Sequence, residues 1–124
     1  MGTRKQILVV DDDEQILFVW RGALARYADR WCVKTARNGG DALDLVTQTP
    51  FDLIVTDIKM PGMNGCELTS AVRRLDEKVA VLWITCFPDA DLHEKADRLD
   101  VRDCLIKPLS ITQIRKVVAE ALVR

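Results

Sequence analysis

The sequence has little that would tie it to a membrane, to nucleic acid or to a secreted fold. Its apolar runs stop well short of the roughly 18 residues that a membrane span needs, and no charged-then-apolar leader precedes the first apolar run. A net charge of -1 over 124 residues gives no general attraction to nucleic acid or anionic lipid. We therefore expect a cytoplasmic domain that binds neither membrane nor nucleic acid.

Cysteine and histidine are too scattered to indicate a zinc or redox site. The four cysteines stand at positions 32, 66, 86 and 104 without a C-x-x-C pair, and His93 is the one histidine. We expect reduced thiols and a surface histidine.

The chain does have an ordinary globular composition, and apolar runs alternate along it with segments of helical periodicity. Hydrophobic residues make up 48% and charged residues 30%, which suits one domain spanning residues 1–124. Apolar runs typical of buried strands occur at 6–10, 31–36, 51–56, 79–85 and 101–106. Helical periodicity occurs at 14–28, 41–47, 66–75 and 90–99, and Ser110 is the expected N-cap of a last helix.

Five alternations of strand and helix predict an α/β domain. Parallel strands need crossover helices, and these cover both faces of the sheet. We predict a doubly wound, flavodoxin-like sheet of five parallel strands in the order 2-1-3-4-5 with five helices. The strand at 31–36, which carries Lys34, is the expected edge.

Polar groups follow four of the predicted strands. Asp11 and Asp12 end the first strand, Asp57 the third, Thr85 the fourth and Lys107 the fifth. In open α/β sheets ligands bind outside these strand ends, where strand order reverses. In the order 2-1-3-4-5 the three carboxylates converge, and carboxylates at contact need a cation between them.

An oxygen-only set of ligands suits Mg2+, which is held by one or two carboxylates together with phosphate oxygens. The hydroxyl of Thr85 and the ammonium of Lys107 would surround the oxygens of a phosphoryl group. One of the carboxylates can then act as a nucleophile and form an aspartyl phosphate.

Four segments in this order carry a family resemblance: VVDDD at 9–13, DLIVTDIKMPGMNG at 52–65, WIT at 83–85 and IKP at 106–108. They resemble the CheY-like receiver domain of two-component response regulators, over essentially the whole chain. The resemblance implies that Asp57 accepts a phosphoryl group from a histidine kinase or phosphotransfer protein.

The resemblance also implies the roles of the residues around Asp57. Asp12 would ligate Mg2+ directly, Asp11 through water, and Lys59 through its backbone carbonyl. Lys107 and Thr85 would neutralise the moving phosphoryl group, and the peptide between Lys107 and Pro108 would be cis. Asp13 and Glu14 belong instead to the first turn of the first helix, where negative charge is favoured.

Such a domain catalyses only its own phosphorylation and slow autodephosphorylation, and it turns over no metabolite. Its expected state is a monomer or a phosphorylation-dependent homodimer, with a possible downstream output domain or protein. The sequence names neither the kinase nor the output.

Four positions depart from the pattern of the family. Cys104 stands where an aromatic residue usually takes part in switching, and Asp100 replaces a common glycine. Cys86 follows Thr85 where alanine is common, and Phe87 lies beside the path of an attacking water. We expect Phe87 and Lys59 to tune how long the phosphoryl group survives.

Two other functions remain open at this point. A phosphohydrolase with Asp57 as nucleophile would need an acid and a substrate pocket, usually on an inserted cap, and the predicted loops are short. A degenerate receiver that serves only as a docking module is favoured mildly by Cys104, whereas the intact acids, threonine and lysine argue against it.

Overall fold

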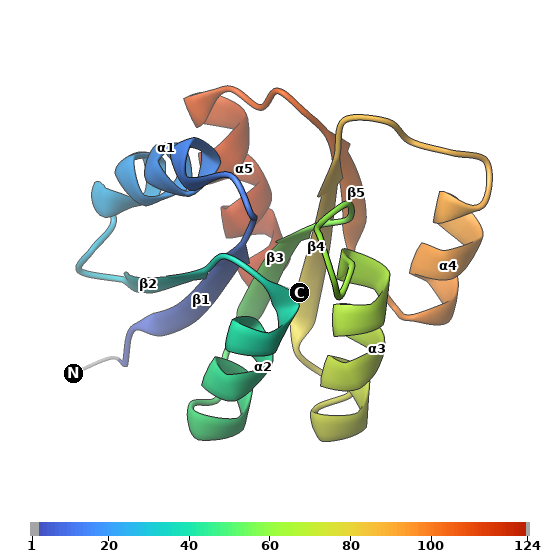
Figure 1. The fold of residues 1–124 in the computed structure, drawn as a ribbon. Helices are drawn as coiled ribbons and strands as arrows, with labels where there is room; N and C mark the ends of the chain where they lie inside the picture. Colours follow the sequence, from blue (N-terminus) through green and yellow to red (C-terminus); the bar gives the residue numbers. More distant parts are fainter. Residues whose placement is uncertain (1–2, 124) are drawn as a thin grey trace.

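The chain folds as one five-stranded parallel sheet with helices on both faces, seen in a computed structural model that describes residues 3–123 (Figure 1). The predicted strand order is confirmed as β2-β1-β3-β4-β5. The strands are β1 (Lys5–Val10), β2 (Trp31–Ala36), β3 (Leu53–Asp57), β4 (Ala80–Thr85) and β5 (Asp103–Ile106). The helices are α1 (Glu14–Ala25), α2 (Gly39–Gln48), α3 (Gly65–Leu75), α4 (Leu92–Arg98) and α5 (Ile111–Leu122).

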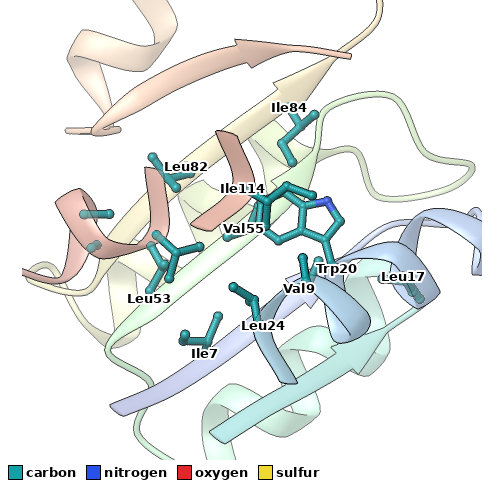
Figure 2. Close-up of a cluster of buried hydrophobic side chains, with 14 residues drawn as sticks. Ile7, Val9, Leu17, Trp20, Leu24, Leu53, Val55, Leu82, Ile84 and Ile114 are labelled. Atoms are coloured by element: carbon teal, nitrogen blue, oxygen red, sulfur yellow. The ribbon is translucent and has the colours of Figure 1, made fainter. Parts of the chain in front are cut away.

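The sheet separates two hydrophobic clusters, because successive side chains of each strand point to opposite faces. We call them the α1/α5 cluster and the α2–α4 cluster after the helices that cover them. In the first, Trp20 and Leu24 of α1 meet Ile114 of α5 over the central strands (Figure 2). In the second, Leu68 of α3 and Leu92 of α4 pack against the opposite face.

The central strands are apolar because both of their faces are covered. Every residue of β3 and β4 is buried, as the nearly continuous apolar runs predicted. β2 is an edge strand, also as predicted, and Lys34 on it is exposed. The order of the strands reverses between β1 and β3, which places their carboxyl ends side by side.

Several element ends differ from the sequence prediction. α1 ends at Ala25 rather than near residue 28, because the amides of Tyr27 and Ala28 donate three residues back and form turns. β3 begins at Leu53 and not at Phe51, and α4 is three residues shorter than the predicted helix at 90–99.

The start of β5 was predicted two residues too early. After α4 the chain turns at Asp100, whose φ is 56°, and the amide of Val101 donates to the carbonyl of Ala96. This is a helix-ending motif with a left-handed residue, a place usually taken by glycine. The departure noted at position 100 is therefore an aspartate in a conformation that its short polar side chain tolerates.

Side-chain caps hold the starts of α1, α3 and α5. Asp13 caps α1 by accepting from the amide of Gln15, which confirms its placement at the helix start. Asn64 and Glu67 form a capping box at α3, and Ser110 and Gln113 form another at α5. Across residues 3–123 no helix has the length and apolar character required to cross a bilayer.

Candidate functional site

The three predicted carboxylates lie together at the carboxyl edge of the sheet. Asp57 is the last residue of β3, and Asp11 and Asp12 follow β1 directly. One oxygen from each of Asp11, Asp12 and Asp57 lies within 4.8 Å of the others. Asp11 and Asp57 are buried, with exposed fractions of 2% and 6%, whereas Asp12 faces solvent.

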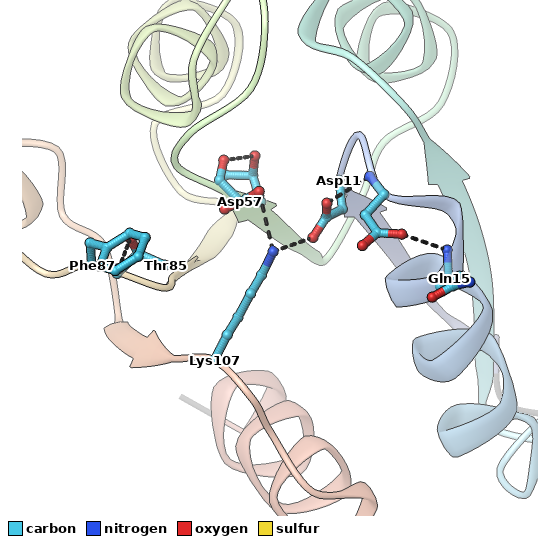
Figure 3. Close-up of polar contacts among 8 residues, drawn as sticks. Asp11, Gln15, Asp57, Thr85, Phe87 and Lys107 are labelled. Atoms are coloured by element: carbon cyan, nitrogen blue, oxygen red, sulfur yellow. Dashed lines mark hydrogen bonds and ion pairs between the residues drawn. The ribbon is translucent and has the colours of Figure 1, made fainter.

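Lys107 places a positive charge between the two buried acids. Its Nζ donates to Asp11 Oδ2 at 2.9 Å and to Asp57 Oδ2 at 3.3 Å (Figure 3). The bond between Lys107 and Pro108 is cis, as the family resemblance implied. Burial alone would lower the pKa of Lys107, but the hydrogen bond and charge of Asp11, together with Asp57, outweigh it and raise the pKa.

Asp11 is the carboxylate that burial affects most clearly. Burial raises the pKa of Asp11 above its ordinary 3.8, and the charge of Asp57 adds to this. The backbone amide of Asp13, which donates to Asp11 Oδ1 at 2.9 Å, and Lys107 oppose that rise without cancelling it. The carboxyl of Asp11 therefore ionises less readily than that of an exposed aspartate.

The donor set fits a divalent cation. Three carboxylates against one ammonium leave two formal negative charges at neutral pH, and the exposed carboxylate of Asp12 gives an approach from solvent. Oxygen ligands of this kind are those that hard cations prefer. The acidic trio is therefore able to hold a metal ion.

Thr85 and Lys107 come from neighbouring strand ends. Thr85 is buried at the end of β4, and its backbone carbonyl accepts from the amide of Lys107 at 2.9 Å. Its hydroxyl oxygen accepts from the amide of Phe87 at 3.2 Å. That bond leaves the hydroxyl proton free to be donated elsewhere.

Lys59 and Phe87 form a contact that the sequence analysis did not predict. The Lys59 Nζ lies 5.4 Å from the centroid of the Phe87 ring, within the range of a cation–π interaction. The phenyl ring is 71% exposed. The sequence held a signal for this contact. Lys59 stands two positions after Asp57, and Phe87 stands two positions after Thr85. The strands that end in Asp57 and Thr85 are neighbours in the sheet.

The loop after β3 passes very close to Asp57. Gly62 has a φ of 75°, which favours glycine, and the amide of Gly65 donates to the carbonyl of Ile58 at 2.8 Å. A Cβ on Gly65 would collide with the carbonyl oxygen of Asp57 and lie 2.9 Å from Ile58 Cα. The glycines of MPGMNG thus fit a turn and a close backbone approach.

Cys104 is half-buried on β5, opposite Trp83 of β4. Burial, followed by the charge of Asp103, raises the pKa of its thiol to about 11. The thiol is neutral at physiological pH and packs as a small apolar group.

Comparison with known proteins agrees with this architecture. Residues 7–119 match the response regulator receiver domain family. The chain is 30% identical over 118 residues to sporulation initiation phosphotransferase F of Bacillus subtilis, covering 95% of this chain and 94% of that protein. It is 33% identical over 121 residues to the transcriptional regulatory protein ZraR of Klebsiella oxytoca, covering 98% of this chain but 27% of that protein.

A solved structure of the Vibrio cholerae chemotaxis protein CheY4 superposes with a TM-score of 0.90 at 25% identity, covering 97% of this chain and all of that one. Together with the strand order and the acidic trio, these matches place the chain in the family of response regulator receiver domains.

Proposed function

We propose that this domain receives a phosphoryl group on Asp57 and thereby switches a partner or output surface. The observation that carries the proposal is the geometry of Asp57, a buried carboxylate 3.3 Å from the ammonium of Lys107 and inside an acidic trio. Receiver domains are typically signalling modules that work with histidine kinases or phosphotransferases, and we assign this chain the same role.

The chemical step asks mainly for positioning and for charge neutralisation. A carboxylate oxygen of Asp57 forms a new P–O bond as the P–N bond of a donor phosphohistidine breaks. The leaving imidazole nitrogen keeps the electron pair of that bond. Lys107 neutralises one phosphoryl oxygen, and the hydroxyl of Thr85 donates a hydrogen bond to another.

Magnesium is the cation that we assign to the acidic trio. Asp12 would hold it directly, Asp11 through water, Asp57 through its second oxygen, and Lys59 through its backbone carbonyl. When bound, Mg2+ supplies positive charge to the phosphoryl oxygens, which Lys107 alone cannot balance. Lys107 offsets part of the repulsion between Asp11 and Asp57 because its ammonium donates to both.

Intact-mass analysis after treatment with acetyl phosphate tests the proposal. We expect an adduct of one phosphoryl group in the presence of Mg2+, and none in EDTA or in Asp57→Asn. Asp44→Asn, which changes an exposed acid on α2, should be labelled like the parent. A parent protein that gains no adduct at Asp57 from any phosphoryl donor contradicts the proposal.

The degenerate receiver, which docks a partner without phosphorylation, is the second candidate. The observation that favours it is Cys104, a half-buried thiol where the switching aromatic is expected. The same labelling separates the two, because a degenerate receiver would gain no phosphoryl adduct in the presence of Mg2+. Such a docking module would also bind its partner equally well as Asp57→Asn. A phosphohydrolase would in addition release phosphate from small phosphate esters at a steady rate.

The context of the domain is part of the proposal. The chain spans about a quarter of the length of several relatives, among them ZraR, and nearly all of phosphotransferase F. We propose that residues 1–124 form one receiver domain, of which residues 1, 2 and 124 lie outside the described part. We place it in the cytoplasm as a monomer or a phosphorylation-dependent homodimer, with output through another domain or protein.

A further inference from the structure

A buried chain of hydrogen bonds connects β4 with the first residue of α3. The indole Nε1–H of Trp83 donates to Thr69 Oγ1 at 2.8 Å, and the Thr69 hydroxyl donates to the carbonyl of Gly65 at 2.8 Å. Trp83 is fully buried and Thr69 is 1% exposed. Each polar group therefore depends on the others, since burial keeps solvent from replacing a lost partner.

The far end of this chain abuts the proposed phosphoacceptor. Gly65 packs against the backbone of Asp57 and Ile58 without space for a Cβ, and its amide donates to Ile58. Contacts this tight between backbones transmit displacement, because closely packed groups cannot move independently. A shift of Gly65 must therefore shift the backbone of Asp57, and the reverse holds as well.

The near end of the chain lies where the family's switching aromatic is missing. Trp83 pairs across the sheet with Cys104, and it points to the same face as Thr85 because the two are two residues apart on β4. A large indole on β4 stands beside a small side chain on β5. Unlike a ring that changes rotamer freely, this indole would leave its own buried N–H unpaired if it turned.

We propose that Thr69 and Trp83 are positioning residues for Asp57, and that through Gly65 they couple the phosphorylation state of Asp57 to α3. The inference rests on the proposed function, since it assumes that Asp57 is the acceptor. In this inference the coupling runs through the buried contacts between β4 and α3, and not through an aromatic residue at position 104.

The kinetic test removes one hydroxyl and retains the shape of the side chain. Thr69→Val should lower the maximal rate of labelling by acetyl phosphate with Mg2+ about tenfold, because small misplacement of a reacting group costs that much or more. The half-saturating concentration of acetyl phosphate should stay the same, and Thr69→Ser should restore the rate. Thr47→Val is the matched control: Thr47 donates to the carbonyl of Asp44 within α2, away from the site, and its loss should leave the rate unchanged.

The spectroscopic test is read in the parent protein, and Trp83→Phe serves only to assign one resonance. In the parent protein, the indole N–H resonance that disappears in Trp83→Phe should shift when beryllofluoride and Mg2+ are added. It should not shift in Asp57→Asn. The indole resonance of Trp31, at the start of the edge strand β2, serves as the internal reference.

The outcomes separate this inference from the proposed function. A parent that takes up no phosphoryl group overturns both. If the parent is labelled, and Thr69→Val is folded and labelled at the same rate as the parent, the inference alone is overturned. If Thr69→Val does not fold, the indole resonance decides: a shift with beryllofluoride supports the inference, and an unmoved resonance in a labelled parent overturns it.

Discussion

The two faces of the sheet are packed with different kinds of side chain. The buried members of the α1/α5 cluster are aliphatic residues together with Trp20. The α2–α4 cluster contains Met60 and the hydrogen-bonded Trp83, with Cys66 and Cys104 at its margin. Aliphatic packing resists change, whereas thioethers, thiols and a buried polar chain provide groups that rearrange or transmit strain. The comparison suggests a rigid face that supports the site and a second face that responds to it.

The largest effects come from matched truncations on the two faces. Leu24 of α1 and Leu68 of α3 are both fully buried, so Leu24→Ala and Leu68→Ala should each lower the free energy of unfolding by about 3 kcal/mol. Urea denaturation checks this. Well below the unfolding transition, only Leu68→Ala should slow labelling by acetyl phosphate. Equal slowing by both variants would break the distinction between the faces.

A pair of glycines sharpens the same comparison at the level of the backbone. Gly65→Ala forces a side chain against the carbonyl of Asp57 and should cost about 1–3 kcal/mol, with a marked loss of labelling. Gly22, within α1, has nothing within 4 Å of its Cβ position. Gly22→Ala should therefore raise the free energy of unfolding by about 0.5–1 kcal/mol and leave labelling unchanged. Thermal unfolding of both variants gives the measurement.

Asp11 follows β1 at the carboxyl edge of the sheet. We expect its buried carboxylate, although it belongs to the site, to lower the free energy of unfolding. Its pKa is raised above 3.8 by burial, so the folded protein holds this proton more tightly than the unfolded chain. The ionised carboxyl then opposes folding once the pH exceeds the folded pKa, and this cost is absent below 3.8. In metal-free buffer at pH 7, Asp11→Asn should be more stable than the parent by about 1 kcal/mol.

Urea titrations of Asp11→Asn and the parent from pH 3.5 to pH 7 test the sign. The difference in the free energy of unfolding should grow as the pH rises. Asp44→Asn serves as the control on α2, and no such growth is expected for it. A stability advantage of Asp11→Asn that is largest at low pH would contradict this account of the site.

The smallest effect is expected at Phe87, in the loop that follows β4. Phe87→Ala removes an exposed ring that contacts Lys59, so stability should change by less than about 0.5 kcal/mol. The phosphoryl group on Asp57 should be lost about threefold faster, because water reaches it more easily. Decay of the labelled mass after removal of the donor measures this lifetime. A lifetime equal to that of the parent would remove Phe87 from any role at the site.

Much of the fold and of the site followed from local pattern. The runs of apolar residues predicted the strands, because a strand covered on both faces must be apolar along its length. The reversal of strand order then brought Asp11 and Asp57 together without knowledge of any side-chain contact. Element ends were less predictable: the left-handed turn at Asp100, which delays β5, depends on how α4 ends against the sheet.

The amino-acid sequence by itself determined the order of strands and helices, the identity of the acids, threonine and lysine at the strand ends, and hence the family. Only the tertiary structure decided which partners meet. Lys107 bridges Asp11 across 96 positions in the chain, and Trp83 bonds Thr69 across 14. The physical reason is that periodicity specifies which face a residue occupies, whereas a hydrogen bond requires two atoms from distant segments to arrive within about 3 Å.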